Sequence, residues 1–158
     1  MSDHSYLPEG YHGVTPSLAV KNASEALAFY ANAFGAQEIA RMMMPDVEKV
    51  MHAEFRIANS IMMLSDEFPE MGVVAPEIGQ GGSFMLYVED TDSAFQRAIE
   101  AGATQIAPVE DMFWGDRIGR VADPYGYRWM IAHRVRECSI EEVQAAGQQW
   151  AKDTQVKP

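Results

Sequence analysis

An internal repeat constrains the fold of this 158-residue chain more than any other feature. Both halves carry a short apolar segment, then a helical stretch, then a Gly-Ala segment, and the Leu-to-Gly intervals are 17 and 16 residues. Matched segments in the same order in both halves predict a duplicated module of about 65–70 residues. The matched segments are Leu18-Ala19-Val20 with Leu86-Tyr87-Val88, Gly35-Ala36-Gln37-Glu38-Ile39 with Gly102-Ala103-Thr104-Gln105-Ile106, and Arg56-Ile57-Ala58-Asn59 with Arg120-Val121-Ala122-Asp123.

Each module is predicted to run strand, helix and three strands, because alternating segments follow one helical pattern. Asn22 is a suitable N-cap and Gly35 a suitable end for the first helix; Asp90 or Thr91, with Gly102, serve the second. The fold class is therefore α+β, with two βαβββ modules in tandem and a C-terminal helix that starts with a Ser-x-x-Glu capping box. The predicted ranges are 12–66 for module 1, 67–81 for the linker, 82–134 for module 2 and 139–152 for the last helix.

Composition excludes several classes of partner. The net charge is −11 without a basic cluster, so we expect no nucleic acid and no anionic membrane. Apolar runs reach about four residues, far below the roughly 20 that cross a bilayer. The N-terminal residues lack the pattern of a signal peptide, and Cys138 is the single cysteine. We therefore expect a cytoplasmic protein with no intramolecular disulfide.

The doubled module resembles a known family. With the turn Asp123-Pro124-Tyr125-Gly126 before its last strand, it is similar to the vicinal oxygen chelate superfamily of glyoxalase I, extradiol dioxygenases and bleomycin-resistance proteins, over about residues 12–134. The resemblance implies that each sheet curls into a half-open cup and that paired modules enclose a ligand groove. Four segments resemble the PhnB-like branch more narrowly: Val14-Thr15-Pro16-Ser17-Leu18-Ala19-Val20, Met51-His52-Ala53-Glu54-Phe55, Met63-Leu64-Ser65-Asp66-Glu67 and Phe113-Trp114-Gly115-Asp116-Arg117.

The same resemblance places four metal-ligand positions on this chain. Metal-using members carry His, Gln or Glu there, whereas this chain has Thr15 and Met63 in module 1 and Ser83 and Met130 in module 2. Hydroxyl and thioether groups form no tight site for a hard or borderline divalent ion. We therefore expect no metal at this site and no cofactor.

Strand alternation assigns the two faces of each predicted sheet, because successive side chains point in opposite directions. In strand 49–57, Met51, Ala53 and Phe55 are predicted to be buried. In strand 127–134, Trp129 and Ile131 are buried. The residues predicted to face the groove are Thr15, Ser17, Ala19, Val50, His52, Glu54, Arg56, Ser83, Met85, Tyr87, Arg128, Met130 and Ala132.

His52 and Glu54 are the candidate catalytic residues. They lie two positions apart on one strand face, about 6.6 Å along the strand. A neutral His can act as a general base or ligand, and a carboxylate can orient it. The alternative is an exposed or structural pair on an open sheet. Arg128 either neutralises Glu54 or holds an anionic group of a ligand.

Candidate ligand-binding residues surround this pair. Trp114 lies in a Gly-containing loop and either covers a ligand by stacking or closes the hydrophobic core. Tyr87, with Met63 and Met130, predicts an apolar and adaptable cavity, although methionines also fill cores. The same loop segment ends in Arg117, which joins Arg128 among the candidate ligand residues.

Three functional hypotheses follow. The first is metal-independent binding of a small organic molecule, as in bleomycin-resistance proteins. The second is an enzyme, a glyoxalase-related lyase or dioxygenase-type enzyme with a general-base His52 or a relocated metal at His52 and Glu54. The third is a protein that serves assembly only. The linker and the exposed Ile140, Val143 and Trp150 of the last helix predict a homodimer.

Overall fold

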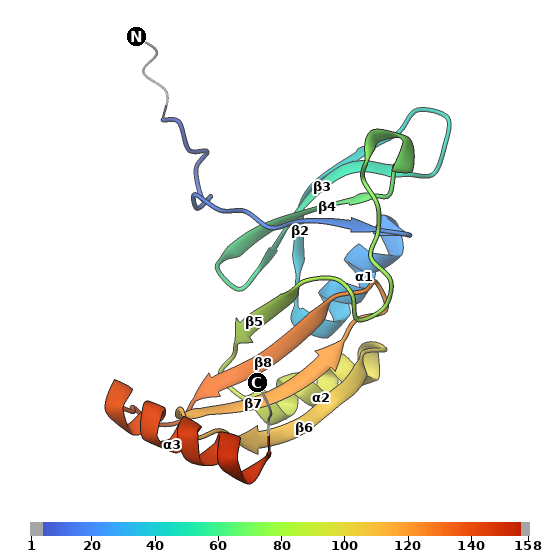
Figure 1. Cartoon of the computed structure of the whole chain (residues 1–158). Helices are drawn as coiled ribbons and strands as arrows, with labels where there is room; N and C mark the ends of the chain where they lie inside the picture. Colours follow the sequence, from blue (N-terminus) through green and yellow to red (C-terminus); the bar gives the residue numbers. More distant parts are fainter. Residues whose placement is uncertain (1–4, 156–158) are drawn as a thin grey trace.

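The computed structural model describes residues 5–155 and confirms the α+β class with tandem modules (Figure 1). Each module contributes one four-stranded mixed sheet, with strand orders β1-β4-β3-β2 and β5-β8-β7-β6. The elements are β1 (Ser17–Val20), α1 (Ala23–Phe34), β2 (Gln37–Met43), β3 (Val50–Ile57), β4 (Ser60–Asp66), the 3-10 helix η1 (Pro69–Met71), β5 (Ser83–Tyr87), α2 (Thr91–Ala101), β6 (Thr104–Asp111), β7 (Asp116–Ala122), β8 (Arg128–Arg134) and α3 (Ile140–Asp153).

Helices α1 and α2 begin and end at the predicted caps, and α3 spans Ile140–Asp153 where the prediction was 139–152. The Asn22 side chain accepts a hydrogen bond from the Glu25 amide, and Asp90 does the same for Ser93. Gly102 follows α2 with a φ of 117°, a left-handed conformation that glycine adopts without steric cost. The capping box of Ser139 and Glu142 starts α3. Local signals thus set the bounds of all three helices.

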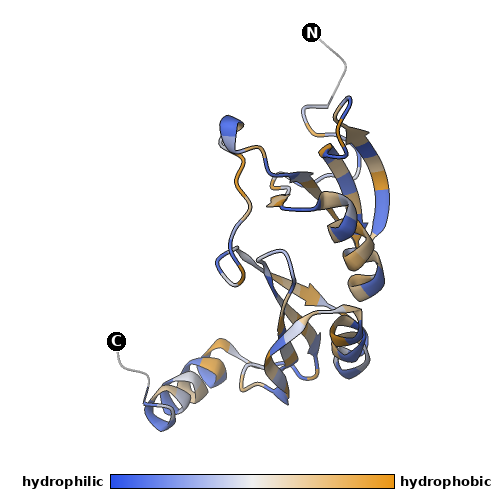
Figure 2. Ribbon diagram, turned by 90° about the vertical axis from the view of Figure 1, so that its right-hand side faces the viewer, coloured by the Kyte–Doolittle hydropathy of each residue, from blue (hydrophilic) through white to orange (hydrophobic). Residues whose placement is uncertain are grey.

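One hydrophobic core joins the two modules. Helices α1 and α2 pack against each other, and Arg97 of α2 donates to the carbonyl of Asn32 in α1 at 2.6 Å. The buried ring of Tyr30 in α1 stacks on Phe55 of module 1, with ring centroids 5.6 Å apart, and lies 5.7 Å from Trp129 of module 2. The helix-facing sides of both sheets therefore meet in a shared core. Figure 2 shows α1 and α2 on these sides of the two sheets.

Asp123 is the polar centre of this core. Its buried carboxylate accepts hydrogen bonds from the Tyr30 hydroxyl at 2.7 Å and the Trp129 indole at 2.9 Å. It also accepts from the amides of Tyr125 and Tyr127 in its own turn. Because a buried charge is tolerated when it is fully hydrogen-bonded, Asp123 fixes the β7–β8 turn to both modules.

Two details of the sequence prediction were wrong. Met51 is 42% exposed while Val50 is fully buried, the reverse of the alternation expected for strand 49–57. The register explains the reversal, because Met42 pairs with His52 and Met43 pairs with Val50, which leaves Met51 as a β-bulge. The bulge restores the predicted phase for His52 and Glu54.

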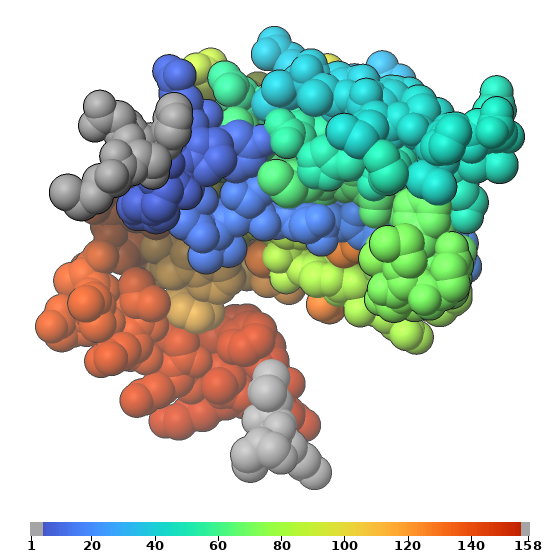
Figure 3. Space-filling view, turned by 90° about the horizontal axis from the view of Figure 1, so that it is seen from above, coloured from blue at the N-terminus to red at the C-terminus, as the bar shows by residue number. Residues whose placement is uncertain are grey.

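Helix α3 has no buried side chain and extends beyond the two modules (Figure 3). Its principal contact is with Phe113, whose ring centroid lies 6.2 Å from that of Trp150. Ile140 is 72% exposed. Among residues 5–155, no helix is long and apolar enough to cross a bilayer.

Candidate functional site

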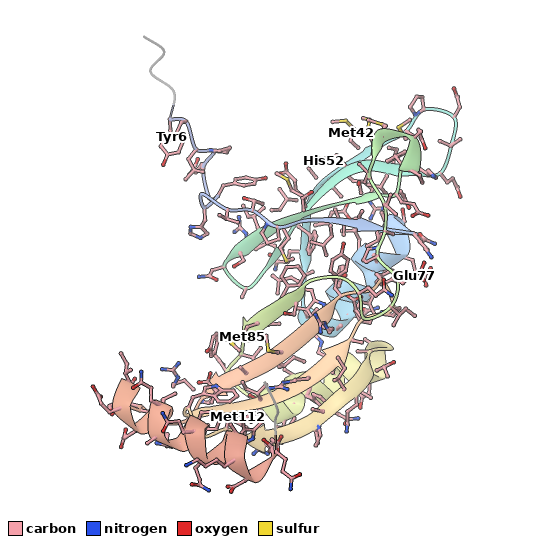
Figure 4. The ribbon with its side chains drawn as sticks, viewed as in Figure 1. Tyr6, Met42, His52, Glu77, Met85 and Met112 are labelled. Atoms are coloured by element: carbon pink, nitrogen blue, oxygen red, sulfur yellow. The ribbon has the colours of Figure 1, made fainter. Side chains whose placement is uncertain are left out.

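Each sheet has one face turned away from the shared core, and we call these faces cup 1 in module 1 and cup 2 in module 2. In cup 1, Met63 of β4 pairs with Ser17 of β1 and with Glu54 of β3. In cup 2, Met130 of β8 pairs with Met85 of β5 and with Arg120 of β7. Because the opposite faces share one core, the two cups of a chain open in different directions. In Figure 4, His52 and Met42 mark the upper module and Met85 the lower one.

The ladder register corrects the sequence echo. Arg56 and Arg120 correspond in the sequence echo, but the strand pairs place Glu54, not Arg56, at the position of Arg120. Glu54 and Arg120 each lie opposite the central methionine of their cup. The two cups therefore carry opposite charges at corresponding positions.

Cup 2 combines apolar and cationic side chains. Met85 is 41% exposed, and Met130 beside it is half-buried. Arg120 and Arg128 are exposed on the same face, since they pair across the ladder with Met130 and Ala122. Neither guanidinium hydrogen-bonds or forms an ion pair with any residue in 5–155. Cup 2 thus offers two available cations beside an open apolar surface.

A polar network lies at one end of cup 2. The Asp116 carboxylate, 1% exposed, accepts hydrogen bonds from Arg134 Nε at 2.7 Å, the Tyr87 hydroxyl at 2.9 Å and Trp114 Nε1 at 3.2 Å. Burial by itself would raise the pKa of Asp116, but the hydrogen bonds from Arg134 and Tyr87 outweigh it and lower that pKa. The network holds Tyr87 and Trp114 in fixed positions.

Arg117 lies outside the cup. It is on the α2 side of β7, where Nε and Nη2 donate to Asp92 of α2 at 2.7 and 2.9 Å and Nη1 donates to Asp111 at 2.9 Å. These carboxylates raise the pKa of Arg117, first through the hydrogen bonds that Arg117 donates to Asp92 and Asp111. Alternation along β7 separates it from Arg120, three residues on, so the structure does not bring it together with the other candidates.

The structure brings His52 and Glu54 together in cup 1. His52 Nε2 lies 3.1 Å from Glu54 Oε1, and the imidazole is 39% exposed. Glu54 is also hydrogen-bonded to Tyr11, and this bond, followed by that to His52, lowers the pKa of Glu54. Gly10 lies beside Ile61 and Arg56, so the segment before β1 runs along cup 1. Tyr11 was not among the predicted site residues, because it lies outside the predicted strands.

The residues at the family's metal positions do not fit a divalent ion. Ser17, rather than Thr15, pairs with Met63, and Met85, rather than Ser83, pairs with Met130. At these positions cup 1 presents a hydroxyl and a thioether, and cup 2 presents two thioethers. Hard or borderline metals need imidazole or carboxylate ligands instead. In the described part of the chain, no three His, Cys, Asp or Glu side chains converge as a metal site would require.

A cavity of about 390 Å³ lies at the seam between the modules, and the sequence did not indicate it. We call it the seam pocket. It is bounded by the segment before β1, the β3–β4 turn and the edge strand β5, and Trp129 forms part of its wall. Its lining is His12, Val14, Pro16, Ile57, Ala58, Asn59, Ser60, Ile61, Met62, Phe84, Met85, Leu86, Tyr87 and Trp129.

Comparisons with known proteins agree with this architecture. Residues 12–131 match the family model described as Glyoxalase/Bleomycin resistance protein/Dioxygenase superfamily. An uncharacterized protein of Mycobacterium bovis is 43% identical over 138 residues, covering 84% of this chain and 90% of the relative. An uncharacterized protein of Arabidopsis thaliana is 28% identical over 125 residues, covering 74% and 75%.

Solved structures share the fold. TioX from Micromonospora superposes with a TM-score of 0.61 at 26% identity, covering 77% of this chain and 99% of that one. The fosfomycin resistance protein FosX from Listeria monocytogenes gives a TM-score of 0.61 at 17% identity, covering 84% and 97%. At the latter identity the likeness extends to the fold alone.

Proposed function

Because the chain belongs to the Glyoxalase/Bleomycin resistance protein/Dioxygenase superfamily, we propose that it binds a small organic molecule in cup 2 without a metal. One observation carries the proposal: within residues 5–155, Arg120 and Arg128 have no hydrogen-bond or ion-pair partner, and they lie beside Met85 and Met130 on an open sheet face. The ligand class is a molecule with an apolar body and an anionic group. Guanidinium groups bind carboxylate, sulfonate or phosphate oxygens through charge-assisted hydrogen bonds, and methionines adapt to irregular apolar shapes.

The charge of the chain supports this ligand class. With a net charge of −11, two arginines on one face that have no partner in the described part of the chain are an exception to the general repulsion of anions. Tyr87 and Trp114, held by Asp116, supply aromatic surface at the opposite end of cup 2 from Arg128. The family description names bleomycin resistance, and a function directed at a small organic molecule agrees with that description.

The proposal includes a cytoplasmic homodimer. The cups of one chain open in different directions, so a groove closed on both sides needs a second copy. A two-fold arrangement would set cup 1 of one protomer over cup 2 of its partner, and the same contact would recur on the other side.

An enzymatic function is the second candidate, and the 3.1 Å contact between His52 and Glu54 favours it. A half-exposed imidazole oriented by a carboxylate is suited to accept a proton from a bound molecule. In this alternative the reaction takes place in cup 1 and the candidate base is His52. Stability and ANS-binding measurements on a His52→Ala protein would separate the two candidates.

The test uses anilinonaphthalenesulfonate (ANS), an anionic aromatic dye, as the probe, with protein dialysed against EDTA. We expect saturable binding, weakened about tenfold or more in Arg120→Gln and Arg128→Gln, since one charge-assisted hydrogen bond contributes about 1.5–3 kcal/mol. Arg117→Gln is the matched control, because it removes the same charge from the opposite face of β7. Equal weakening by all three substitutions, or binding only after a divalent metal is restored, would overturn the proposal.

A further inference from the structure

The two modules meet at two seams that correspond by the internal repeat. Leu18 of β1 pairs with Leu64, and Leu86 of β5 pairs with Ile131, so Leu64 and Ile131 are equivalent. Ser60 lies four residues before Leu64 and Tyr127 lies four residues before Ile131, so Ser60 is equivalent to Tyr127. Each of these two residues ends a hairpin turn and lies next to the edge strand of the other module.

Tyr127 fills the first seam. Its side chain is almost fully buried, and its hydroxyl accepts a hydrogen bond from the Ala19 amide at 3.2 Å while donating to the Ala19 carbonyl at 3.0 Å. Ala19 lies on edge strand β1. Because Met63 N donates to Pro16 O, alternation along this strand turns the amide and carbonyl of Ala19 away from the sheet. One phenol thus occupies the seam and satisfies a free strand edge.

The second seam is the open seam pocket. Ser60 stands there at the position of Tyr127, and its side chain is too short to reach across. The opposite wall is β5, the edge strand of module 2, and Phe84, Leu86 and Trp129 complete an apolar surface. The volume of about 390 Å³ falls within the roughly 300–1,000 Å³ range of small-molecule sites.

The edge of β5 leaves main-chain groups available in this pocket. Val88 N donates to Ala132 O and Arg128 N donates to Gly82 O, so the even-numbered residues of this segment face β8. By the alternation of a parallel ladder, the amide and carbonyl of Tyr87 face the other way, toward the pocket. Tyr87 is the equivalent of Ala19, because Leu86 is the equivalent of Leu18.

We propose that the seam pocket is a binding site for a small molecule with a phenol group. In the first seam, the phenol of Tyr127 fills the equivalent space with one planar ring and bonds the edge strand with one hydroxyl. A ligand with the same ring and hydroxyl therefore suits the seam pocket. The bound phenol would place its ring between the β3–β4 turn and Trp129, and its hydroxyl on the amide and carbonyl of Tyr87. Because the pocket exceeds one ring in volume, substituted phenols bind more tightly than phenol itself.

This site goes beyond the proposed function, although β5 forms a wall of both. Cup 2 takes its ligand through Arg120 and Arg128, and neither residue lines the seam pocket. Met62 lines the seam pocket and Met130 lies in cup 2, so the methyl signals of these two methionines report the sites separately. Failure of one proposal therefore leaves the other testable.

The test titrates p-cresol, the side-chain analogue of tyrosine, into the full chain and follows isotope-labelled methionine methyl groups by NMR. We expect saturable shifts at Met62, and binding at least about fivefold tighter than that of toluene, which has the same ring and methyl group but no hydroxyl. Arg128→Gln should leave this binding unchanged. Equal affinity for p-cresol and toluene, or no shift at Met62, would overturn the proposal.

Substitution of Ser60 gives a second readout. Ser60→Tyr places a phenol at the position equivalent to Tyr127, so it should abolish p-cresol binding while ANS binding persists. Ser60→Ala, the matched control, should bind p-cresol as the unaltered protein does. Retained p-cresol binding in a folded Ser60→Tyr protein would overturn the proposal. If that variant fails to fold, the comparison of p-cresol with toluene at Met62 still decides.

Discussion

The β3–β4 turn and the β7–β8 turn occupy equivalent places in a duplicated fold, yet one borders a cavity between the modules and the other fills the space between them. The second, from Asp123 to Tyr127, places a buried carboxylate and a phenol between the modules. The first consists of Ala58 and Asn59, with Ala58 at a φ of 51°, and leaves a cavity beside it. The strands of the repeat thus set the architecture, whereas the turn residues decide whether a seam is core or pocket.

The cups differ in a similar way. Cup 1 carries Glu54 opposite its central methionine, with His52 and Tyr11 as hydrogen-bond partners. Cup 2 carries Arg120 at the same position, with no partner in the described residues. The same scaffold therefore presents a hydrogen-bonded carboxylate in cup 1 and an arginine without a described partner in cup 2.

The largest effect is expected in the two turns. Asp123→Ala leaves the Tyr30 hydroxyl and the Trp129 indole without their buried acceptor, and should lower the free energy of unfolding by about 3–5 kcal/mol. Asn59→Ala, in the exposed turn of module 1, should change it by about 0.5 kcal/mol or less. Urea unfolding of both variants measures the difference. Similar losses in the two would mean that the turns are not specialised.

A smaller, pH-dependent effect is expected from Asp116 in cup 2. Its pKa is lowered in the folded state, so its stabilisation is fully present above the ordinary Asp pKa of 3.8 and is lost as the pH falls through the lowered value. Asp116→Asn should therefore cost about 1–2 kcal/mol at pH 7, and the cost should shrink below about pH 4. Unfolding at several pH values checks this. A cost that does not vary with pH would exclude the carboxylate charge as its source.

The smallest effect is expected from His52 in cup 1. His52→Ala removes a half-exposed side chain, so stability should change by about 0.5 kcal/mol or less. ANS affinity should stay within about twofold of that of the unaltered protein, because the proposed ligand cations lie in cup 2. Calorimetric titration at pH 5, 6.5 and 8 includes the range in which histidine titrates. A marked loss of affinity that also varied with pH would favour the enzymatic candidate.

The fold was predictable from the sequence because its signals are local. Asn22, Gly102 and the Ser139–Glu142 box define helix ends within a few residues of chain, and the repeat supplies the tandem topology. Strict alternation failed at Val50 and Met51, because a β-bulge changes the phase of a strand without a sequence mark. The sequence echo is offset from the ladder by two residues, because similarity between two segments does not record how their strands pair.

The candidate site was less predictable because it depends on packing. Alternation placed Arg128 and Met130 on one face, but it did not show that α1 and α2 would pack together and turn the cups outward. Arg117 was grouped with ligand residues by its position next to Trp114, whereas its carboxylate partners come from α2 and β6. The seam pocket arises only where two modules meet, so no single segment encodes it.

The most direct test of metal-independent binding in cup 2 is an NMR titration of the EDTA-dialysed protein with ANS, read at its methionine methyl groups. We predict a saturable shift at Met130, and an unchanged signal at the exposed Met71 of η1, which lies outside both cups. Arg120→Gln and Arg128→Gln should each move the midpoint of the Met130 shift about tenfold higher in ANS concentration. A Met130 signal that stays constant while ANS binds, or that shifts only when a divalent metal is added, would contradict the account.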